Sequence, residues 1–484
     1  MALEEIRNTK IKKVEELRKA GMDPYPASSG RTNTISEIIE NFDKYAQEKN
    51  GLVLAGRVMA KREHGGSMFF DLRDASGKFQ GFIKEDIVGK DNFTKFSELI
   101  DIGDFIEITG TLFKTKKDEK TLETLNFKLL TKALLPLPEK WHGLQDTEER
   151  LRKRYLDLIM NPNEKGLFIK KNIFWQKVRS FLAERGGLEV ETPILEKIPG
   201  GADAEPFTTH FNALDIDLYL RISLEFNLKR LIVAGYEKVF EIGRIFRNEG
   251  IDREHLQDYT QMEMYWAYTD YKQLMDVVKS MCLETIGAVN GSLSHKYQEI
   301  NVDWSGEWKT YDYYKVFKKN TGLDLTDIFE KDLKKYAENE GIDIKKHIGK
   351  GRLIDVIFKK KVKSQLIEPG FLVLPPVEIE PLAKRWPKDR NRVERFQVMA
   401  GGTELGKGFS ELNDPMDQRK RLEEQVKLRE KGDKEAHRMD DDFLEALEYG
   451  MPPTAGFGMS ERFFAFITDK PVRETVFFPL MRSK

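Results

Sequence analysis

Apolar and polar residues alternate through most of the segment from Leu52 to Leu130, which predicts short β-strands. About five such runs are separated by turns, and a helical pattern over Asn92–Ile100 precedes the fourth run. Five strands with a helix in that position are typical of an OB-fold barrel. Because small barrels serve many functions, this pattern predicts a fold and leaves its role open.

Helical spacing of apolar residues precedes the barrel, in Leu3–Ala20 and again in Ile35–Gln47. Two prolines follow the barrel and interrupt any regular element there. We therefore expect a helical extension over residues 1–50, the barrel over 51–131 and a linker over 132–145.

Residues 146–484 mix the two patterns. Helices are predicted over Glu164–Arg185, Ser223–Ala234, Tyr271–Ile286 and Pro415–Lys431. Alternating runs at Pro206–Phe211, Asp217–Leu220, Gly370–Leu374 and Arg395–Ala400 predict strands. The strands follow one another without regular crossover helices, so we expect an α+β domain with an antiparallel sheet. Residues 301–363 are predicted to form a lysine-rich helical insert within it.

Composition narrows the function only slightly. The 484 residues include 80 Lys+Arg and 81 Asp+Glu, so any contact with RNA needs a local patch of positive charge. The single cysteine, Cys282, excludes an intramolecular disulfide and fits a reducing cytosol. The sequence has no signal-peptide core and no run of 18 apolar residues, so we expect a cytoplasmic protein that makes no membrane contact.

The stretch Phe240–Tyr265 predicts a hairpin whose two strands hold a charged loop over a cavity. Charged residues precede or occupy the loop: Arg247, Glu249, Arg253 and His255. An arginine at a strand end can hold a phosphate bidentately, and a second cation can hold the far end of a triphosphate. Glu263, on the returning strand, can face a cation. Taken alone, the loop fits a surface salt-bridge motif equally well.

Two carboxylates in GGTELGKGFSELND, Glu404 and Glu411, lie seven residues apart. A regular strand would place them on opposite faces, but a turn or bulge near Gly406–Gly408 can bring both to one side. Two hard oxygen ligands facing a triphosphate suit Mg²⁺. The alternative is a pair of solvated glutamates beside a glycine-rich turn.

A glycine-rich strand passes directly into an apolar helix in PPTAGFGMSERFFAFI. Glycines allow a ligand to approach the backbone, and Arg462 can stack on a planar base. A plain strand–helix junction is the alternative. The phosphate loops G-x-x-x-x-G-K-[ST] and strand-linked G-x-G-x-x-G are both missing from the sequence, so ATP use through them is not expected.

The predicted barrel carries residues that suit single-stranded nucleic acid. Phe69 and Phe70 could stack on a base, and Arg57, Lys61, Arg62 and Arg73 could meet phosphates. The alternative is that the phenylalanines are core residues, although neighbours on a strand face opposite sides, so at most one should be.

Taken in order along nearly the whole chain, these segments resemble the class II aminoacyl-tRNA synthetases, and among them the bacterial type that acts on lysine. The strings that carry the resemblance are RKAGMDPYP, WHGLQDTEERLRKRYLDLI, GGLEVETPILEKIPGG, LYLRISLEFNLKRL, FRNEG, LIEPGF, PLAKR, GFSELND, PPTAG and FPLMR. The resemblance implies ATP-dependent activation of L-lysine, transfer to the 3′ end of tRNA(Lys), and a homodimer formed through the first class II motif around Pro193.

The resemblance also implies roles for single residues. Arg247 would hold the α-phosphate of ATP and the lysine carboxylate, and Arg247 and Arg462 would be the catalytic pair. The remaining ATP contacts would be Glu249 at the adenine amine, His255 at the outer phosphates, Tyr259 and Arg462 on the two faces of adenine, and Glu404. Glu404 and Glu411 would bind Mg²⁺.

For lysine, the resemblance implies contacts from Gly201 and Glu225 to the α-amino group and from Glu263 and Tyr265 to the side-chain ammonium. Phe409 and Glu411 would complete that site. In the barrel, Phe69, Gln80 and Glu119 would read the U-rich anticodon.

This sequence departs from the family at Lys407, where asparagine is usual, and in a third motif that is one residue shorter. We expect the Lys407 ammonium beside the carboxylate pair and the substrate, where it would change the metal requirement or lysine binding. Two other functional classes are weighed: a catalytically silent, RNA-binding paralogue, and an enzyme that modifies another acceptor. The intact arginine and glutamate set argues against the first, and the barrel argues against the second.

Overall fold

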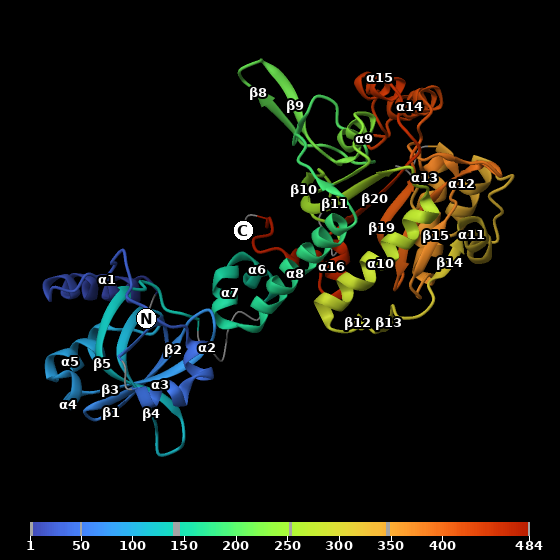
Figure 1. Cartoon of the computed structure of the whole chain (residues 1–484). Helices are drawn as coiled ribbons and strands as arrows, with labels where there is room; N and C mark the ends of the chain where they lie inside the picture. Colours follow the sequence, from blue (N-terminus) through green and yellow to red (C-terminus); the bar gives the residue numbers. More distant parts are fainter. Residues whose placement is uncertain (1–2, 49–50, 139–145, 251–253, 345–348, 483–484) are drawn as a thin grey trace. The chain divides into compact units, whose positions relative to one another are not determined.

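The structure is a computed structural model that describes residues 3–48, 51–138, 146–250, 254–344 and 349–482. The chain divides into two compact units, Met1–Thr147 and Glu148–Lys484 (Figure 1). In the described residues, no helix is both long enough and apolar enough to cross a membrane. The expected linker falls partly in 139–145, outside the described residues.

The first unit is a closed five-stranded barrel of order β1-β2-β3-β5-β4, which confirms the predicted OB fold. Its strands are β1 (Leu52–His64), β2 (Ser67–Arg73), β3 (Lys78–Lys84), β4 (Phe105–Lys114) and β5 (Lys120–Thr131). Two helices, α4 (Glu85–Val88) and α5 (Lys90–Leu99), precede the fourth strand, where one helix was expected.

Helix α1 (Leu3–Lys19) leads the first unit, as expected. The second predicted helix is divided at Asn41 into α2 (Ile35–Glu40) and α3 (Phe42–Glu48). A capping box at Thr34 begins α2, and Asn41, whose backbone is not helical, ends it. Ile35, Ile38 and Phe42 join the barrel core, so these helices cover one side of the barrel.

The second unit is built on an eight-stranded sheet of order β14-β15-β18-β19-β20-β11-β10-β6. Its strands are β14 (Lys309–Asp312), β15 (Gly370–Val373), β18 (Arg395–Ala400), β19 (Thr403–Ser410), β20 (Thr454–Ser460), β11 (Asp258–Ala267), β10 (Lys238–Phe246) and β6 (Leu188–Glu189). The six central strands are antiparallel, and only the two edge pairs are parallel. This arrangement confirms the α+β prediction.

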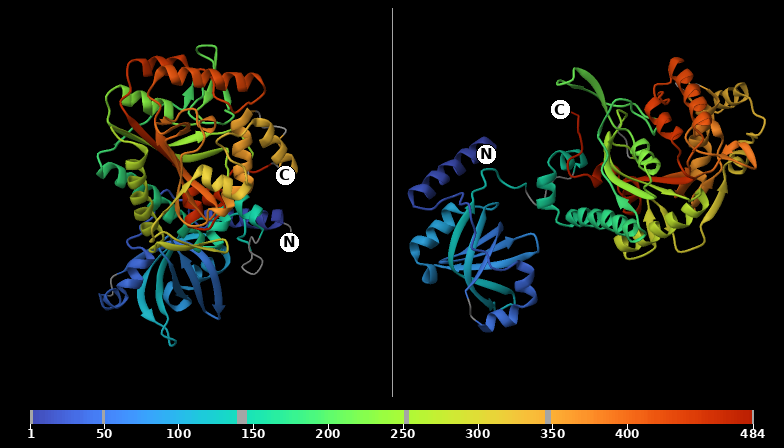
Figure 2. Two further views of the ribbon diagram at one scale, coloured as in Figure 1. Left: turned by 90° about the vertical axis from the view of Figure 1, so that its right-hand side faces the viewer. Right: turned by 45° about the horizontal axis from the view of Figure 1, so that its top comes forward.

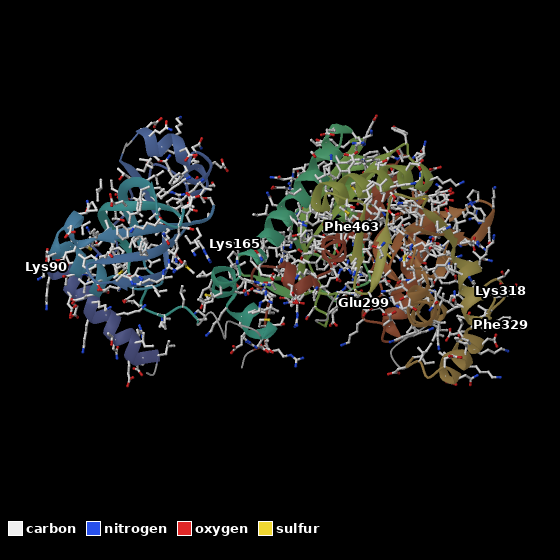
Figure 3. The ribbon with its side chains drawn as sticks, turned by 90° about the horizontal axis from the view of Figure 1, so that it is seen from below. Lys90, Lys165, Glu299, Lys318, Phe329 and Phe463 are labelled. Atoms are coloured by element: carbon white, nitrogen blue, oxygen red, sulfur yellow. The ribbon has the colours of Figure 1, made fainter. Side chains whose placement is uncertain are left out.

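Two long helices, α8 (Asn163–Glu184) and α10 (Tyr271–Asn290), lie side by side and pack against the sheet (Figures 1 and 2). Their apolar residues share one core with the sheet and with α16 (Arg462–Ile467). Figure 3 shows Phe463 of α16 inside the unit, and it is 1 % exposed. These helices cover one face of the sheet and leave the other face for the cavity described below.

The strands predicted at Pro206–Phe211 and Asp217–Leu220 form β8 (Thr208–Phe211) and β9 (Ile216–Leu220). With β7 (Leu195–Glu196) they make a separate three-stranded sheet, so they do not extend the large one. Helix α9 (Glu225–Val233) follows and begins two residues later than predicted.

The insert is mainly helical, as predicted, with α11 (Tyr313–Thr321), α12 (Glu330–Asn339), α13 (Gly349–Ile357) and a π-helical turn over Phe358–Val362. It also supplies β14, the edge strand of the large sheet, which the sequence pattern did not indicate. Figure 3 shows Lys318 and Phe329 of the insert at the surface of the unit. Helices α14 (Pro415–Glu430) and α15 (Asp441–Glu448) complete the unit.

Candidate active site

A cavity of about 640 Å³ opens over the central strands of the large sheet. Strands β11, β18, β19 and β20 supply its floor, and α13 and α14 supply part of its wall. Ten of the residues singled out from the sequence line this cavity: Gly201, Glu225, Arg247, Tyr259, Glu263, Tyr265, Glu404, Phe409, Glu411 and Arg462. Segments more than 250 residues apart in the chain therefore meet in one place.

Strand β20 gives the cavity floor a trough, because Gly456 and Gly458 have no side chains. We call these two residues the glycine trough. Gly458 lies between Lys407 on β19 and Glu263 on β11, so those two residues are two strand spacings, roughly 10 Å, apart. Gly456 likewise lies between Phe409 on β19 and Tyr265 on β11. A Cβ atom at Gly456 would stand 2.4 Å from Glu411 Oε1, so only glycine leaves this space open.

Glu263, on one side of the trough, is 3 % exposed and fully supported by hydrogen bonds. The Ser223 hydroxyl and the Leu224 N–H, just before α9, donate to Oε1 at 2.8 and 3.1 Å. The Tyr265 hydroxyl donates to Oε2 at 3.0 Å. These donors fix the orientation of the carboxylate in a place with little water. It is therefore suited to receive an ammonium group.

Two further carboxylates, Glu225 and Glu411, lie beside this position and share one lysine. The Lys229 ammonium is 2.5 Å from Glu225 Oε1 and also forms an ion pair with Glu411 Oε2. Burial raises the pKa of Glu225 to about 7 and raises the pKa of Glu411 well above its ordinary value, and Lys229 opposes both shifts. Burial would lower the pKa of Lys229, but the two carboxylates outweigh burial and raise it.

Two arginines of the cavity lining lie near Tyr259, and His255 contacts one of them. The Arg247 guanidinium lies 5.7 Å from the centre of the Tyr259 ring, and Arg462 Nη2 is 2.8 Å from His255 Nε2. Burial raises the pKa of Tyr259, against the lowering effect of Arg247 and Arg462. Cations and an aromatic ring placed together can bind phosphates and a planar base.

Local structure explains why Arg247 points into the cavity. It follows the last residue of β10, and its N–H donates to the Gln257 carbonyl at 2.7 Å across the hairpin. Its side chain donates to the Ile222 carbonyl at 3.3 Å. Glu249 and His255 do not line the cavity themselves, and Arg253 lies outside the described residues. The structure places His255 against Arg462, which does line the cavity.

Glu404 reaches the cavity because β19 contains a bulge. Met399 pairs with Glu404 but Val398 pairs with Gly406, so Leu405 is the extra residue. The bulge lies just before the glycines rather than among them, and Glu404 and Glu411 both line the cavity. The Gln397 amide bonds to Glu404, and although burial would raise the pKa of Glu404, Arg395 and Arg462 hold it below its ordinary value.

Lys407 lines the cavity, with its ammonium 3.1 Å from Glu380 Oε2. The same carboxylate oxygen receives Arg395 at 3.3 Å. The cavity environment would lower the pKa of Lys407, but Glu380 raises it, so the ammonium stays charged. Its direct partner is thus Glu380, and Glu404 acts on it at longer range.

The barrel carries the other group of candidate residues. Phe70 is fully buried, whereas Phe69 is half-buried and packs on Phe82 with ring centres 4.7 Å apart. This confirms that only one of the two phenylalanines belongs to the core. Gln80 donates to Thr121 Oγ1 at 2.9 Å, and Glu119 is exposed two residues before Thr121. The three expected anticodon residues therefore lie in neighbouring strands and one adjoining turn.

Two of the basic residues considered for phosphate contact also hold the barrel unit together. The Lys61 ammonium donates to three carbonyls at the end of α5, and burial lowers its pKa to about 8. Arg57 donates to the Gly103 carbonyl and covers the Phe105 ring at 4.2 Å. These contacts favour structural roles, and phosphate contact by these two residues stays a prediction. Arg62 stays on the outer face, opposite Phe69.

The comparisons with known proteins agree with this geometry. The family described as tRNA synthetases class II (D, K and N) matches residues 146–482, and the OB-fold nucleic acid binding domain matches residues 52–130. An antiparallel sheet with arginines around its cavity, preceded by such a barrel, defines a class II aminoacyl-tRNA synthetase.

Curated relatives refine this assignment. The lysine–tRNA ligase of Thermoanaerobacter sp. strain X514 is 44 % identical over 486 residues, which cover 100 % of this chain and 97 % of the relative. The lysine–tRNA ligase of Bacillus subtilis strain 168 is 43 % identical over 480 residues, covering 98 % and 96 %. That of Thermotoga maritima is 43 % identical over 489 residues, covering 100 % and 97 %. Within its class, the chain belongs to the lysine–tRNA ligase family.

Several residues of the site were not anticipated from the sequence. Lys229 had a usable signal, since Glu225 and Lys229 stand at i and i+4 on a predicted helix. No sequence pattern pointed to Gln397, Arg395 or Glu380, because only the tertiary fold brings them beside Glu404 and Lys407.

Proposed function

We propose that this cavity joins L-lysine to ATP as lysyl-adenylate, and that the lysyl group then passes to the 3′ end of tRNA(Lys) with release of AMP. The observation that carries the proposal is that the buried carboxylate of Glu263, beside the glycine trough, and the cations of Arg247 and Arg462 line one cavity. Lysine-dependent exchange of pyrophosphate into ATP is the test. Its absence would overturn the proposal, and exchange without charging of tRNA(Lys) would favour another acceptor.

The chemistry needs positioning and charge more than proton transfer. A carboxylate oxygen of lysine attacks the α-phosphorus of ATP, the new P–O bond forms, and the bond to the β-phosphate breaks with release of pyrophosphate. The attacking carboxylate is already ionised, so no general base is required. We assign Arg247 to the lysine carboxylate and the α-phosphate, where it would stabilise the charge that develops on the phosphate oxygens.

We assign the adenine to the space between Tyr259 and Arg462, with Glu249 at its amine and His255 near the outer phosphates. The support is the close grouping of Arg247, Tyr259 and Arg462, and the Arg462–His255 contact at 2.8 Å. An aromatic face and a guanidinium on opposite sides of a base bind it through stacking.

Lysine is assigned to the glycine trough. Glu263 and Tyr265 would receive the side-chain ammonium together with Glu411, and Glu225 and Gly201 would receive the α-amino group. Gly201 supports this position because a Cβ there would stand 2.8 Å from the Glu225 Cβ, and its φ of +80° favours glycine. Phe409 forms the apolar wall beside Gly456.

For Mg²⁺, the charged oxygen donors of the cavity favour Glu404 as the ligand. The other expected ligand, Glu411, is 1 % exposed and ion-paired with Lys229, so we assign it to lysine rather than to the metal. Among the described residues, no group of three or more acidic, histidine or cysteine side chains could hold a metal ion. One carboxylate plus substrate phosphates is a common way to hold Mg²⁺, which supplies charge neutralisation at the phosphates when bound.

Replacing Lys407 with asparagine should raise the Mg²⁺ concentration needed for half-maximal pyrophosphate exchange by about two- to fivefold, the scale of one partly solvated charge interaction. The reason is that the Lys407 ammonium, near Glu404, would supply part of the positive charge that otherwise comes from Mg²⁺ at the phosphates, so its loss leaves more charge for the ion to neutralise. A magnesium titration of both proteins measures the effect. Superimposable titration curves, with unchanged lysine affinity, would contradict the role given to Lys407.

We assign the anticodon to the barrel face that carries Phe69, Gln80 and Glu119. Phe69→Ala should raise the KM for tRNA(Lys) about tenfold, because stacking of a base on an aromatic ring contributes about 1–3 kcal/mol. Lysine-dependent pyrophosphate exchange should not change, since the reaction takes place in the other unit. Lys90→Ala, at an exposed site of the same unit, is the control. Equal KM values for Phe69→Ala and the parent would remove this assignment.

We propose a homodimer through the first class II motif. Apolar side chains are exposed around Pro193: Leu188, Ile194, Leu195, Phe211 and Leu214. Exposed apolar side chains gathered in this region of the chain favour an interface here. Leu195→Asp should therefore give a monomer by light scattering, whereas Phe329→Asp, an exposed apolar site in the insert, should not. A parent protein that is already monomeric would end this proposal.

We place the protein in the cytoplasm. The single cysteine, Cys282, is buried and free, so the protein has no intramolecular disulfide, as is usual in a reducing compartment. Burial raises the pKa of the Cys282 thiol, which keeps it unreactive.

A further inference from the structure

Lys229 lies at the centre of the lysine site without reaching the cavity surface. Its side chain is 0 % exposed, and its ammonium is held between Glu225 and Glu411. It comes from α9, one turn after Glu225, so the helix itself fixes the first ion pair. Lys229 is absent from the cavity lining, whereas both of its partners belong to it.

The charges around the trough do not balance. Three carboxylates, which we call the carboxylate cluster, are at most 5 % exposed: Glu225, Glu263 and Glu411. The Tyr265 hydroxyl lies within the electrostatic range of all three. Neighbouring buried carboxylates have cations of their own, with Glu241 paired to Arg221 and Glu380 paired to Arg395. Among the described residues, Lys229 is the only ion-pair partner of this cluster, so two negative charges remain when all three carboxylates are ionised.

Unpaired charges in a buried site cost free energy unless a ligand of opposite charge neutralises them. The geometry leaves room for such a ligand, because Lys229 takes only Oε2 of Glu411. Glu411 Oε1 has no hydrogen-bond partner among the residues that the structure describes. That oxygen lies at the floor of the trough, 2.4 Å from the position of a Cβ on Gly456.

We propose that Lys229 is a resident counter-ion that sets the charge of the lysine site, so that the site selects an amino acid with two ammonium groups. The cluster and Lys229 together carry two negative charges, which the α- and side-chain ammonium groups of lysine neutralise. An amino acid with one ammonium leaves one negative charge buried. Lys229 is thus a positioning residue that acts through Glu225 and Glu411. The inference rests on the lysine site proposed above.

The test compares affinities for lysine and for norleucine, in which a methyl group replaces the side-chain ammonium. Lys229→Met should weaken lysine binding at least about tenfold, since one negative charge then stays unbalanced. Glu411→Gln should also weaken it and should reduce the preference for lysine over norleucine. The double variant restores the balance of charges, so its lysine affinity should be closer to that of the parent than the affinity of either single variant.

Rescue in the double variant is the decisive result, because a purely structural role of Lys229 predicts that two losses add. Additive losses, or unchanged lysine affinity in Lys229→Met, would overturn the inference. Lys229→Arg keeps the charge and should keep the preference for lysine, which leaves the idea testable even where Lys229→Met does not fold. A change from lysine to norleucine preference with Lys229→Arg would also overturn it.

The controls separate this inference from the proposed function. Lys132→Met removes the ammonium of another fully buried, ion-paired lysine, in the barrel unit, and should lower stability without changing lysine affinity. Calorimetric titration on the intact protein gives both affinities without any turnover. A parent that does not bind lysine would overturn the proposed lysine site together with this inference. A parent that binds lysine, with no rescue in the double variant, would overturn the counter-ion role alone.

Discussion

Replacing Arg247 with alanine should lower the rate of lysyl-adenylate formation by about 10²–10³-fold, the usual cost of removing one donor that stabilises developing charge. Arg247 is the cation that the hairpin fixes at the end of β10, with its backbone bonded across to Gln257 and its guanidinium near Tyr259. The loss should appear mainly in kcat, because the interaction is strongest when charge develops on the α-phosphate. Lysine-dependent pyrophosphate exchange measures it.

Arg244→Ala is the matched control. Arg244 lies on β10, three residues before Arg247. It forms an ion pair with Asp258 and does not line the cavity. Its replacement should leave the exchange rate within about threefold of the parent, the scale of a surface ion pair. An Arg247 variant with the same small change would contradict the assignment of Arg247 to the α-phosphate.

Much of this site follows from local pattern. The period-two alternation through Phe240–Tyr265 predicts a hairpin, and β10 and β11 pair in continuous register from Lys238–Trp266 to Phe246–Asp258. That register places Glu263 on the cavity face and Arg247 just beyond the strand end. Because the positions of Glu263 and Arg247 depend only on neighbouring residues of the hairpin, both can be predicted from the sequence.

Other features depend on contacts between distant segments and have no local pattern. The three-stranded sheet of β7, β8 and β9 stands apart from the large sheet, although its strands alternate like the others. Which sheet a strand joins is decided by tertiary packing rather than by its own sequence. The same holds for β14, which the lysine-rich insert contributes to the sheet edge.

Glu411 shows how tertiary context changes an interpretation. Its spacing from Glu404 predicts a metal pair, and the bulge at Leu405 does bring both residues to one cavity. The sequence pattern contains no sign that Lys229 would reach Glu411 from α9, more than 180 residues earlier. Since a carboxylate paired with an ammonium is a poor second ligand, the fold favours its other expected role, in the lysine site.

Replacing Glu263 with glutamine should lower kcat/KM for lysine by about 10³-fold or more and remove most of the discrimination against norleucine. The substitution keeps the size of the side chain but removes its charge, and an amide NH2 group in place of one carboxylate oxygen cannot accept the hydrogen bonds that the Leu224 N–H and the Ser223 hydroxyl donate. A site built around a buried polar partner rejects an analogue lacking that partner by about 10⁴–10⁵-fold.

Competition between lysine and norleucine in pyrophosphate exchange measures the loss for Glu263→Gln. The control for a general change of charge is Glu299→Gln, at an exposed glutamate of the same unit.

The losses expected for Arg247→Ala and Glu263→Gln should depend differently on the lysine concentration. Arg247→Ala should slow exchange at every lysine concentration, because its contact matters most in the transition state. Glu263→Gln should be partly overcome by raising lysine, because an ammonium–carboxylate contact already forms in the bound state. A Glu263 variant that keeps both its lysine KM and its preference over norleucine would show that the side-chain ammonium binds elsewhere in the cavity.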